Sequence, residues 1–165
     1  MPNALRHIKF PSPESADEDG IVAIGGDYGT DALCEAYRNG IFPWPLTFRD
    51  PRTGKSRPAP LTWFSPDPRA VLFFDEVHVP RSLERFRRKC AWRFSRNESF
   101  EAVMRECAKQ PRPEQDGTWI TEELLRGYTR LFREGKAWSV EVWEGPTLVG
   151  GIYGVFIEGI ASGES

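Results

Sequence analysis

The sequence predicts an α+β fold in which helices come first and an antiparallel sheet follows. Between residues 97 and 135, apolar side chains recur at the i, i+3, i+4, i+7 spacing of helices. From Ser139 onward, short runs of strand-forming residues are joined by tight turns that contain glycine. Helices followed by a meander of neighbouring strands are typical of the α+β class.

The first part of the chain is rich in proline and glycine and is expected to contain one short helix, from Asp31 to about Asn39. Leu33 and Tyr37 are four residues apart there, and Gly40 is placed to end the helix. Residues 45–60 are predicted to be an exposed, mobile loop without regular structure. This loop carries the basic residues Arg49, Arg52, Lys55 and Arg57.

A strand-like run, AVLFF (70–74), precedes the most basic segment of the chain. Residues 81–96 hold seven Lys or Arg and one Glu, a local charge of +6 in a chain whose net charge is −2. If the segment is helical, its apolar residues form a stripe that is expected to face the core, and its basic residues form a stripe on the opposite face. The apolar stripe consists of Leu83, Phe86 and Cys90, and the basic stripe of Arg81, Arg85 and Arg88. The basic stripe fits either a solvated helix surface or a phosphate-binding ridge.

Two further helices and three strands complete the prediction. One helix starts near a cap at Asn97, with Phe100, Val103, Met104 and Cys107 on its core face. Another is capped by Thr121 and closed by Gly135. Strands are expected at SVEVW, TLVGGIYGVFI and IASGES, with Gly150–Gly151 a bulge or a close approach of the backbone to a ligand.

Composition excludes several classes of protein. The three cysteines and two histidines show no metal-ligand spacing, so we expect neither a metal nor a cofactor. No apolar run reaches the roughly twenty residues of a membrane span, and residues 1–10 lack the features of a secretory signal. A cytoplasmic protein is expected.

Seven short motifs occur in an order that resembles the leucyl/phenylalanyl-tRNA–protein transferases, bacterial enzymes that move Leu or Phe from aminoacyl-tRNA onto the N-terminal Arg or Lys of a protein. Each motif alone is common, but together they extend over nearly the whole chain. They are GIVAIGGD (20–27), NGIFPWP (39–45), TWFSPDPRAVL (62–72), GTWIT (117–121), VEVW (140–143), LVGGIYG (148–154) and SGES (162–165).

The resemblance implies a small N-terminal domain, residues 1–62, followed by an acetyltransferase-like (GNAT) domain, residues 63–165. It also implies that the family's chain continues beyond SGES, so the sheet is expected to be incomplete and the second domain truncated. Its last strand would be left as an open edge unless a second chain or self-association completes it.

The resemblance also implies site residues. Trp44, Trp119 and Tyr128 match residues that hold the aminoacyl adenosine, and an indole face stacks well on any base. Ile152 and Ala161 match positions that line the apolar pocket for the Leu or Phe side chain. For each of these five residues, ordinary core or strand packing is the alternative interpretation, and the preference between Leu and Phe stays open.

With the resemblance, Arg81, Arg85 and Arg88 are expected to hold the acceptor stem through its phosphates, which suits an enzyme that accepts several tRNA species. Glu164 of SGES matches a glutamate in the reaction centre, where a carboxylate attracts the cationic acceptor or assists removal of its proton. The Asp and Gln that the family uses to activate the amine have no counterpart in this sequence.

Three accounts of the chain therefore stay open from sequence. It is a fragment of a transferase, a natural short form that needs a complementing chain or a dimer, or a non-catalytic module that binds tRNA ends or N-terminal peptides. We expect weak or no transfer from this chain alone.

Overall fold

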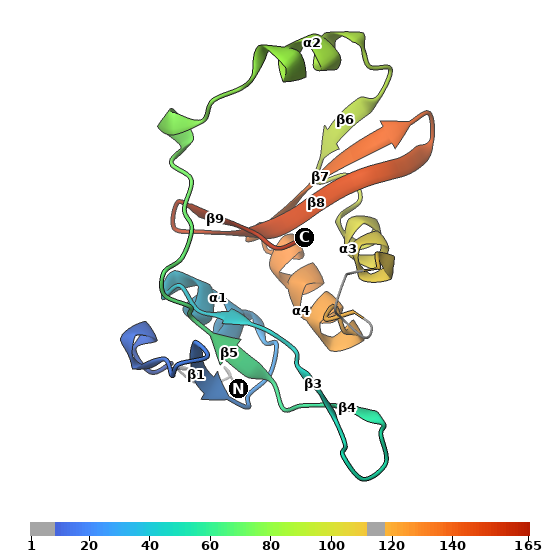
Figure 1. Cartoon of the computed structure of the whole chain (residues 1–165). Helices are drawn as coiled ribbons and strands as arrows, with labels where there is room; N and C mark the ends of the chain where they lie inside the picture. The colour runs from blue at the N-terminus through green and yellow to red at the C-terminus, as the bar shows by residue number, and fades with distance from the viewer. Residues whose placement is uncertain (1–8, 112–117) are drawn as a thin grey trace, which may run out of the picture.

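The computed structural model describes residues 9–111 and 118–165, and in these residues four α-helices and three antiparallel sheets are present. The predicted α+β class is confirmed (Figure 1). Gly117 of the GTWIT motif lies outside the described residues. None of the helices in the described ranges is long and apolar enough to cross a bilayer.

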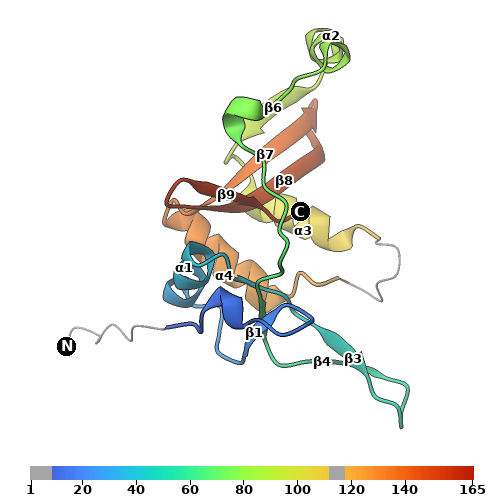
Figure 2. The same cartoon turned by 60° about the vertical axis from the view of Figure 1, so that its left-hand side comes forward.

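The largest sheet has four strands in the order β6-β7-β8-β9. Its strands are β6 (Arg93–Arg96), β7 (Ala137–Glu144), β8 (Thr147–Ile157) and β9 (Ile160–Gly163). The helices α3 (Phe100–Lys109) and α4 (Glu122–Arg133) cover one face of it, together with α1 (Thr30–Arg38) (Figure 2). The last three strands follow the predicted meander, and the Glu158–Gly159 turn has the positive φ angles of a tight hairpin, 51° and 86°.

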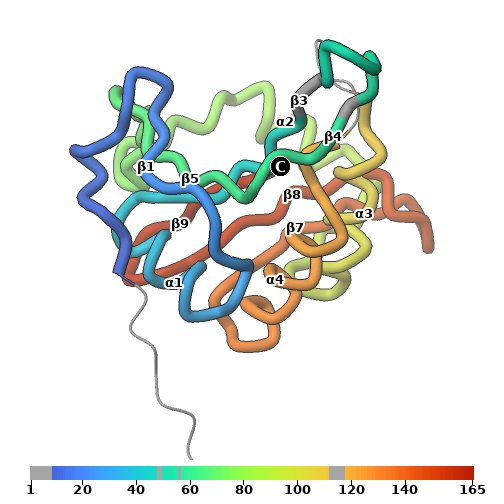
Figure 3. Tube along the Cα trace, turned by 90° about the horizontal axis from the view of Figure 1, so that it is seen from below, coloured from blue at the N-terminus to red at the C-terminus, as the bar shows by residue number. Residues whose placement is uncertain are grey.

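The face of the sheet toward the helices carries the core. Tyr153 and Val155 alternate there with residues that point away, and both are buried. Figure 3 views the molecule from the side of a second, smaller sheet in the order β1-β5-β2, which the sequence did not predict. Its strands are β1 (Ile21–Ile24), β5 (Thr62–Phe64) and β2 (Phe42–Pro43). The expected domain boundary after residue 62 therefore falls inside β5.

The prediction of an irregular loop over residues 45–60 is wrong. Strands β3 (Thr47–Arg49) and β4 (Ser56–Pro58) form a hairpin there. The Asp50 side chain accepts hydrogen bonds from the backbone N–H groups of Arg52 and Thr53, and Gly54 takes a φ of 65°, so local turn chemistry closes the hairpin.

Helix ends largely follow the sequence signals. The Thr121 side chain accepts a hydrogen bond from the Leu124 backbone N–H at 3.2 Å, so the predicted cap of α4 is confirmed. Gly40 and Gly135 follow α1 and α4 with φ of 72° each, the left-handed conformation expected of a C′ glycine. Inside α4, Gly127 lets the chain pass Tyr28, because a Cβ there would lie 2.7 Å from the Tyr28 Cβ.

The basic segment differs most from expectation. The helix α2 (Arg81–Lys89) ends at Lys89, and residues 93–96 form β6 on the edge of the large sheet. The apolar stripe of α2 was predicted to join the core, but Leu83 and Phe86 are 54% and 50% exposed. Figures 1 and 2 show why: α2 projects away from the sheets, so the described chain offers its stripe no layer to pack against.

The strand predicted at residues 70–74 is also absent. The segment is extended without a strand partner and leads into a 3₁₀ turn, η2 (Phe74–Glu76). Val71, Leu72, Phe73 and Phe74 are all exposed. A run of β-forming residues needs a neighbouring strand to become part of a sheet, and in the described chain none lies beside this one.

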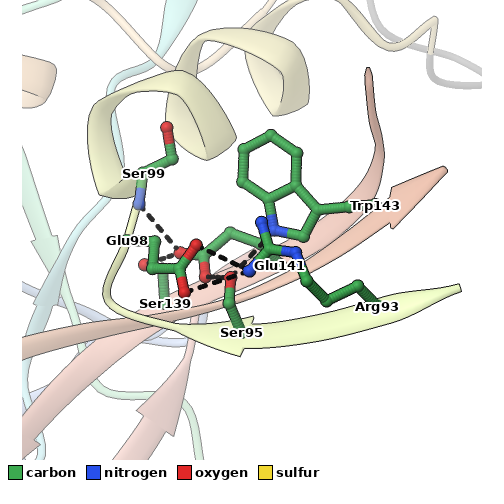
Figure 4. A network of polar contacts seen from close by, with 7 residues as sticks. All are labelled: Arg93, Ser95, Glu98, Ser99, Ser139, Glu141 and Trp143. Atoms are coloured by element: carbon green, nitrogen blue, oxygen red, sulfur yellow. Dashed lines mark hydrogen bonds and ion pairs between the residues drawn. The ribbon is translucent and has the colours of Figure 1, made fainter. Parts of the chain in front are cut away.

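The start of α3 is fixed by a buried carboxylate rather than by the predicted Asn97 cap. Glu141 of β7 is fully buried and accepts from the Ser95 hydroxyl (2.5 Å), the Ser139 hydroxyl (2.6 Å) and the backbone N–H of Ser99 (3.3 Å) (Figure 4). Ser99 is the N-cap residue. One side chain therefore joins β6, β7 and the positive end of the α3 dipole.

Burial alone would raise the pKa of Glu141, but hydrogen bonds from Ser139, Ser95 and the backbone outweigh it and lower the pKa. The network extends outward, since the Trp143 indole N–H donates to the Ser95 hydroxyl at 2.8 Å. At its rim, Arg93 lies 5.0 Å from the Trp143 ring and pairs with Glu98. The Asn97 side chain instead accepts from the Ser139 backbone N–H.

The Gly150–Gly151 pair was expected to be a bulge or a close approach to a ligand. Next to this glycine pair, the register between β7 and β8 shifts, at Val142 and Trp143 of β7. At Gly151, a Cβ would lie 2.9 Å from a methyl group of Val103, so the glycine accommodates helix α3. The close neighbour is a core side chain.

Candidate functional site

Trp44 and Trp119 come from distant parts of the sequence and stack face to face. Their ring centroids are 5.0 Å apart and their planes differ by 9°. Trp119 is buried, whereas Trp44 is partly exposed. The backbone N–H of Trp44 donates to the Thr62 carbonyl at 2.8 Å, which fixes the residue beside β5. The pair thus consists of a partly exposed indole that rests on a buried one.

Glu164 follows β9 and is partly buried on the helix-facing side of the sheet. Its backbone N–H donates to the Tyr153 carbonyl at 2.9 Å, and its carboxylate accepts from the Ser162 hydroxyl at 2.8 Å. Burial raises the pKa of Glu164, and this effect is offset in part by hydrogen bonds from Tyr37 and Ser162 and by the charge of Arg69.

Tyr128 lies in the core rather than on an open surface. It is fully buried on α4, and its hydroxyl is 2.5 Å from that of Tyr37 on α1. Its ring packs edge-on against Tyr153 of β8, with centroids 6.1 Å apart. Burial and the nearby charge of Glu164 hold the pKa of Tyr128 well above its usual range. Tyr128 therefore packs in the core between Tyr37 and Tyr153.

Ile152 and Ala161 lie on the opposite face of the large sheet. Ile152 pairs with Val140 and Ala161 with Phe156, and both pairs point away from the helices. Ile152 is 42% exposed. The two residues are separated along β8 by four positions, roughly 13 Å of strand. The structure does not bring them together with Tyr128, Trp44 or each other.

Arg81, Arg85 and Arg88 are exposed on α2. Arg88 pairs weakly with Glu84, with 3.8 Å between the charged atoms. The helix that carries them projects away from the helices that cover the large sheet in both views (Figures 1 and 2). Exposed, mostly unneutralised charge of this kind suits contacts with an extended anion.

A cavity of about 430 Å³ lies between the end of β1 and α4. Its lining carries both signs of charge, from Asp27, Glu123, Arg126 and Arg130. The residues predicted from sequence are not among the described residues that line it. In the described ranges, no group of three His, Cys, Asp or Glu side chains is arranged to hold a metal ion.

Sequence reasoning missed Tyr37 and Arg69 as neighbours of Glu164. Tyr37 belongs to the apolar stripe of α1, and Arg69 follows the small sheet and donates to the Gly40 carbonyl at 2.7 Å. Arg69 also lies over the Phe42 ring, 4.9 Å from its centroid. Spacing along the chain gives no sign that either residue affects the pKa of Glu164.

Comparison with known proteins gives a consistent result. A family model described as leucyl/phenylalanyl-tRNA protein transferase matches residues 71–165. The chain is 47% identical over 160 residues to the leucyl/phenylalanyl-tRNA–protein transferase of Anaeromyxobacter sp. (strain K), an alignment that covers 97% of this chain and 64% of that protein. It is likewise 47% identical over 158 residues to the protein of the same name in Shewanella baltica (strain OS185), covering 94% and 62%. The chain thus spans less than two thirds of the length of these relatives.

Proposed function

The chain belongs to the leucyl/phenylalanyl-tRNA–protein transferase family, and from this membership we propose that it binds the charged 3′ end of a tRNA in the transfer of Leu or Phe to a protein. The acceptor is an N-terminal Arg or Lys, the setting is the cytoplasm, and the product is a protein marked for degradation. The finer fold assignment, an acetyltransferase-like domain over residues 63–165 after a small domain over residues 1–62, is part of the same proposal.

The observation that carries the proposal is the stack of Trp44 on Trp119. With ring centroids 5.0 Å apart the two indoles are in contact, so no base fits between them. The terminal adenine would therefore stack on the outer face of Trp44, and the buried Trp119 would hold that ring in place. Such stacking is worth about 1–3 kcal/mol per base and accepts any base.

The chemistry is aminolysis of an ester. The amine nitrogen attacks the ester carbonyl carbon, the C–N bond forms, the bond to the tRNA 3′ oxygen breaks, and one proton passes from nitrogen to that oxygen. An N-terminal amine is roughly 10–20% neutral at pH 7, so the protein must mainly align the reactants and carry the proton. A partly buried carboxylate with a raised pKa suits that task, which supports the assignment of Glu164.

The remaining proposed site residues lie away from the Trp44–Trp119 pair. Ile152 and Ala161 would line the pocket for the Leu or Phe side chain on the open face of the sheet, and Tyr128 would support the site from the core. Arg81, Arg85 and Arg88 would contact the phosphates of the acceptor stem. A second chain or self-association at β9 would complete the sheet.

Transfer and binding together test the proposal. The protein is mixed with tRNA charged with labelled Phe or Leu and with peptides that begin with Arg, Lys or Ser. The proposal predicts saturable binding that prefers charged over uncharged tRNA, and weak transfer that puts label only on the Arg and Lys peptides. Binding without any transfer would favour a non-catalytic tRNA-end module instead. No preference for charged tRNA would contradict both.

Replacement of Arg81, Arg85 and Arg88 together by Gln should weaken tRNA binding and flatten its salt dependence. The slope of log K against log salt is negative, and each lost phosphate contact makes it less steep by about 0.9 for a duplex. The triple variant should therefore have a slope that is smaller in magnitude by about two to three. The slope is measured with uncharged tRNA from low to physiological salt. The matched control replaces three other exposed basic residues by Gln: Lys109, Arg126 and Arg133. Equal slopes in the two variants would contradict phosphate binding by Arg81, Arg85 and Arg88.

A further inference from the structure

We propose that Arg69 is a further tRNA-binding residue, which contacts the 5′ phosphate of the terminal adenosine when the adenine base stacks on Trp44. The inference rests on the proposed function, because it takes the Trp44–Trp119 pair as the platform for that adenosine. It adds a residue that the sequence did not predict, since the three arginines expected to hold phosphates all lie on α2.

A series of ring contacts connects Arg69 to the platform. The guanidinium carbon of Arg69 lies 4.9 Å from the centroid of the Phe42 ring. The Phe42 ring packs edge-on against Trp44, with ring centroids 6.4 Å apart and planes that differ by 77°. Trp44 in turn stacks on Trp119. The positive charge of Arg69 is therefore separated by a single ring from the indole on which the base is proposed to stack.

A hydrogen bond holds the guanidinium group at this place. Nη1 of Arg69 donates to the Gly40 carbonyl at 2.7 Å, just beyond the C-terminal end of α1, where the helix dipole also favours a cation. A guanidinium group carries five N–H donors in a rigid plane, so a bond to one carbonyl leaves donors for a ligand. The Arg69 residue is exposed, and a ligand from solvent can reach it.

The charge of Arg69 is not neutralised by an ion pair. Across residues 9–111 and 118–165, no carboxylate lies within ion-pair distance of its guanidinium group. A guanidinium group that is already held in place loses little freedom on binding, and it can form two parallel hydrogen bonds to one phosphate. These properties suit an anionic group of the ligand rather than the base.

The 5′ phosphate is the anionic group that this arrangement can reach. Proteins that bind single strands combine an aromatic ring under the base with basic groups along the backbone. The sugar joins the base to its 5′ phosphate, so a base stacked on an indole leaves that phosphate beside the platform. Arg69 lies beside the platform, on the Phe42 side. The arginines of α2 would then serve phosphates further along the acceptor stem.

Calorimetric titration with two small ligands tests the inference. One is adenosine with phenylalanine on a non-hydrolysable 3′ amide, and the other is the same compound with a 5′ phosphate. In the wild type at low salt, the phosphate should strengthen binding about tenfold, as expected of charged hydrogen bonds at an exposed site. In Arg69→Gln, the two ligands should bind alike, and the ligand without phosphate should bind as it does to the wild type.

Arg133→Gln removes another exposed positive charge and is the matched control, in which the tenfold gain should remain. An equal gain in Arg69→Gln and the wild type would overturn the inference. So would an equal loss of affinity for both ligands, because Arg69 would then only support the end of α1 and the Phe42 ring. If Arg69→Gln does not fold, Arg69→Lys takes its place and should show a smaller gain than the wild type, since an ammonium group cannot bind a phosphate through a planar fork. An undiminished gain in Arg69→Lys would then overturn the inference.

The same titrations separate this inference from the proposed function. Binding of the ligand without phosphate, together with no gain that depends on Arg69, would contradict the inference and leave the adenosine platform supported. No binding of either ligand to the wild type would contradict the proposed function, and the role of Arg69 with it.

Discussion

Replacement of Glu141 by Ala is expected to lower the free energy of unfolding by about 3–5 kcal/mol. The side chain is fully buried and serves donors from Ser95, Ser139 and Ser99. Its removal leaves those donors without an acceptor, opens a cavity and withdraws the charge at the start of α3. Urea denaturation followed by circular dichroism measures the change.

Glu144→Ala at the exposed end of the same strand is the control and should change stability by less than about 0.5 kcal/mol. The network also predicts a pH dependence. Because the pKa of Glu141 is lower in the fold than its ordinary value of 4.5, its stabilising effect is complete above that value and is lost as the pH falls through the folded pKa. Acid should therefore destabilise the wild type more than Glu141→Ala, and parallel losses would contradict the network.

Gly154→Ala is expected to destabilise the protein by about 3 kcal/mol and to detach β9. A Cβ at Gly154 would overlap the carbonyl oxygen of Ser162, and the Trp138 indole lies 2.7 Å from the same point. A backbone carbonyl cannot turn aside as a side chain can. β9 would have to move, and the contacts of Glu164 would move with it.

Gly150→Ala offers a matched control four residues earlier on β8. A Cβ there would lie 3.7 Å from the Val142 side chain, an ordinary contact, so stability should change by less than about 1 kcal/mol. Hydrogen exchange of the β9 amides distinguishes the two variants. Equal protection of β9 in Gly154→Ala and wild type would contradict the close approach.

Local signals predicted the parts of the fold that neighbouring residues determine. Spacing and turn chemistry within a few residues determine the Thr121 cap, the glycines that end α1 and α4, and the strands β7, β8 and β9. The start of α3 does not, because its acceptor is Glu141, forty-two positions away from Ser99. No rule of spacing connects those two residues.

The basic segment, residues 81–96, shows what periodicity alone cannot predict. Its pattern correctly predicted a helix with separate basic and apolar stripes, yet the apolar stripe of Leu83 and Phe86 is exposed. Periodicity tells which residues share a face and does not tell whether a layer covers that face. For the same reason an apolar run at residues 70–74 was assigned to a strand although the described chain provides it no partner.

At the site, the ordered motifs predicted Trp44 and Trp119 as binding residues, and the two rings are in contact in the structure. Glu164 also came from a motif. Its neighbours Tyr37 and Arg69 could not be recognised, because Tyr37 has the pattern of an ordinary core residue and Arg69 that of a surface arginine. Their effect on the pKa of Glu164 depends on how α1, β9 and the small sheet pack.

The central claim is that the exposed face of Trp44, supported by Trp119, is the platform for the terminal adenosine. Calorimetric titration with an adenosine that carries phenylalanine on a non-hydrolysable 3′ amide tests it most directly. Trp44→Ala should weaken binding about 5- to 150-fold, Trp44→Phe should weaken it much less, and Trp92→Ala, beside Phe86 on the projecting segment, should have no effect. The same affinity in Trp44→Ala as in the wild type would contradict the account.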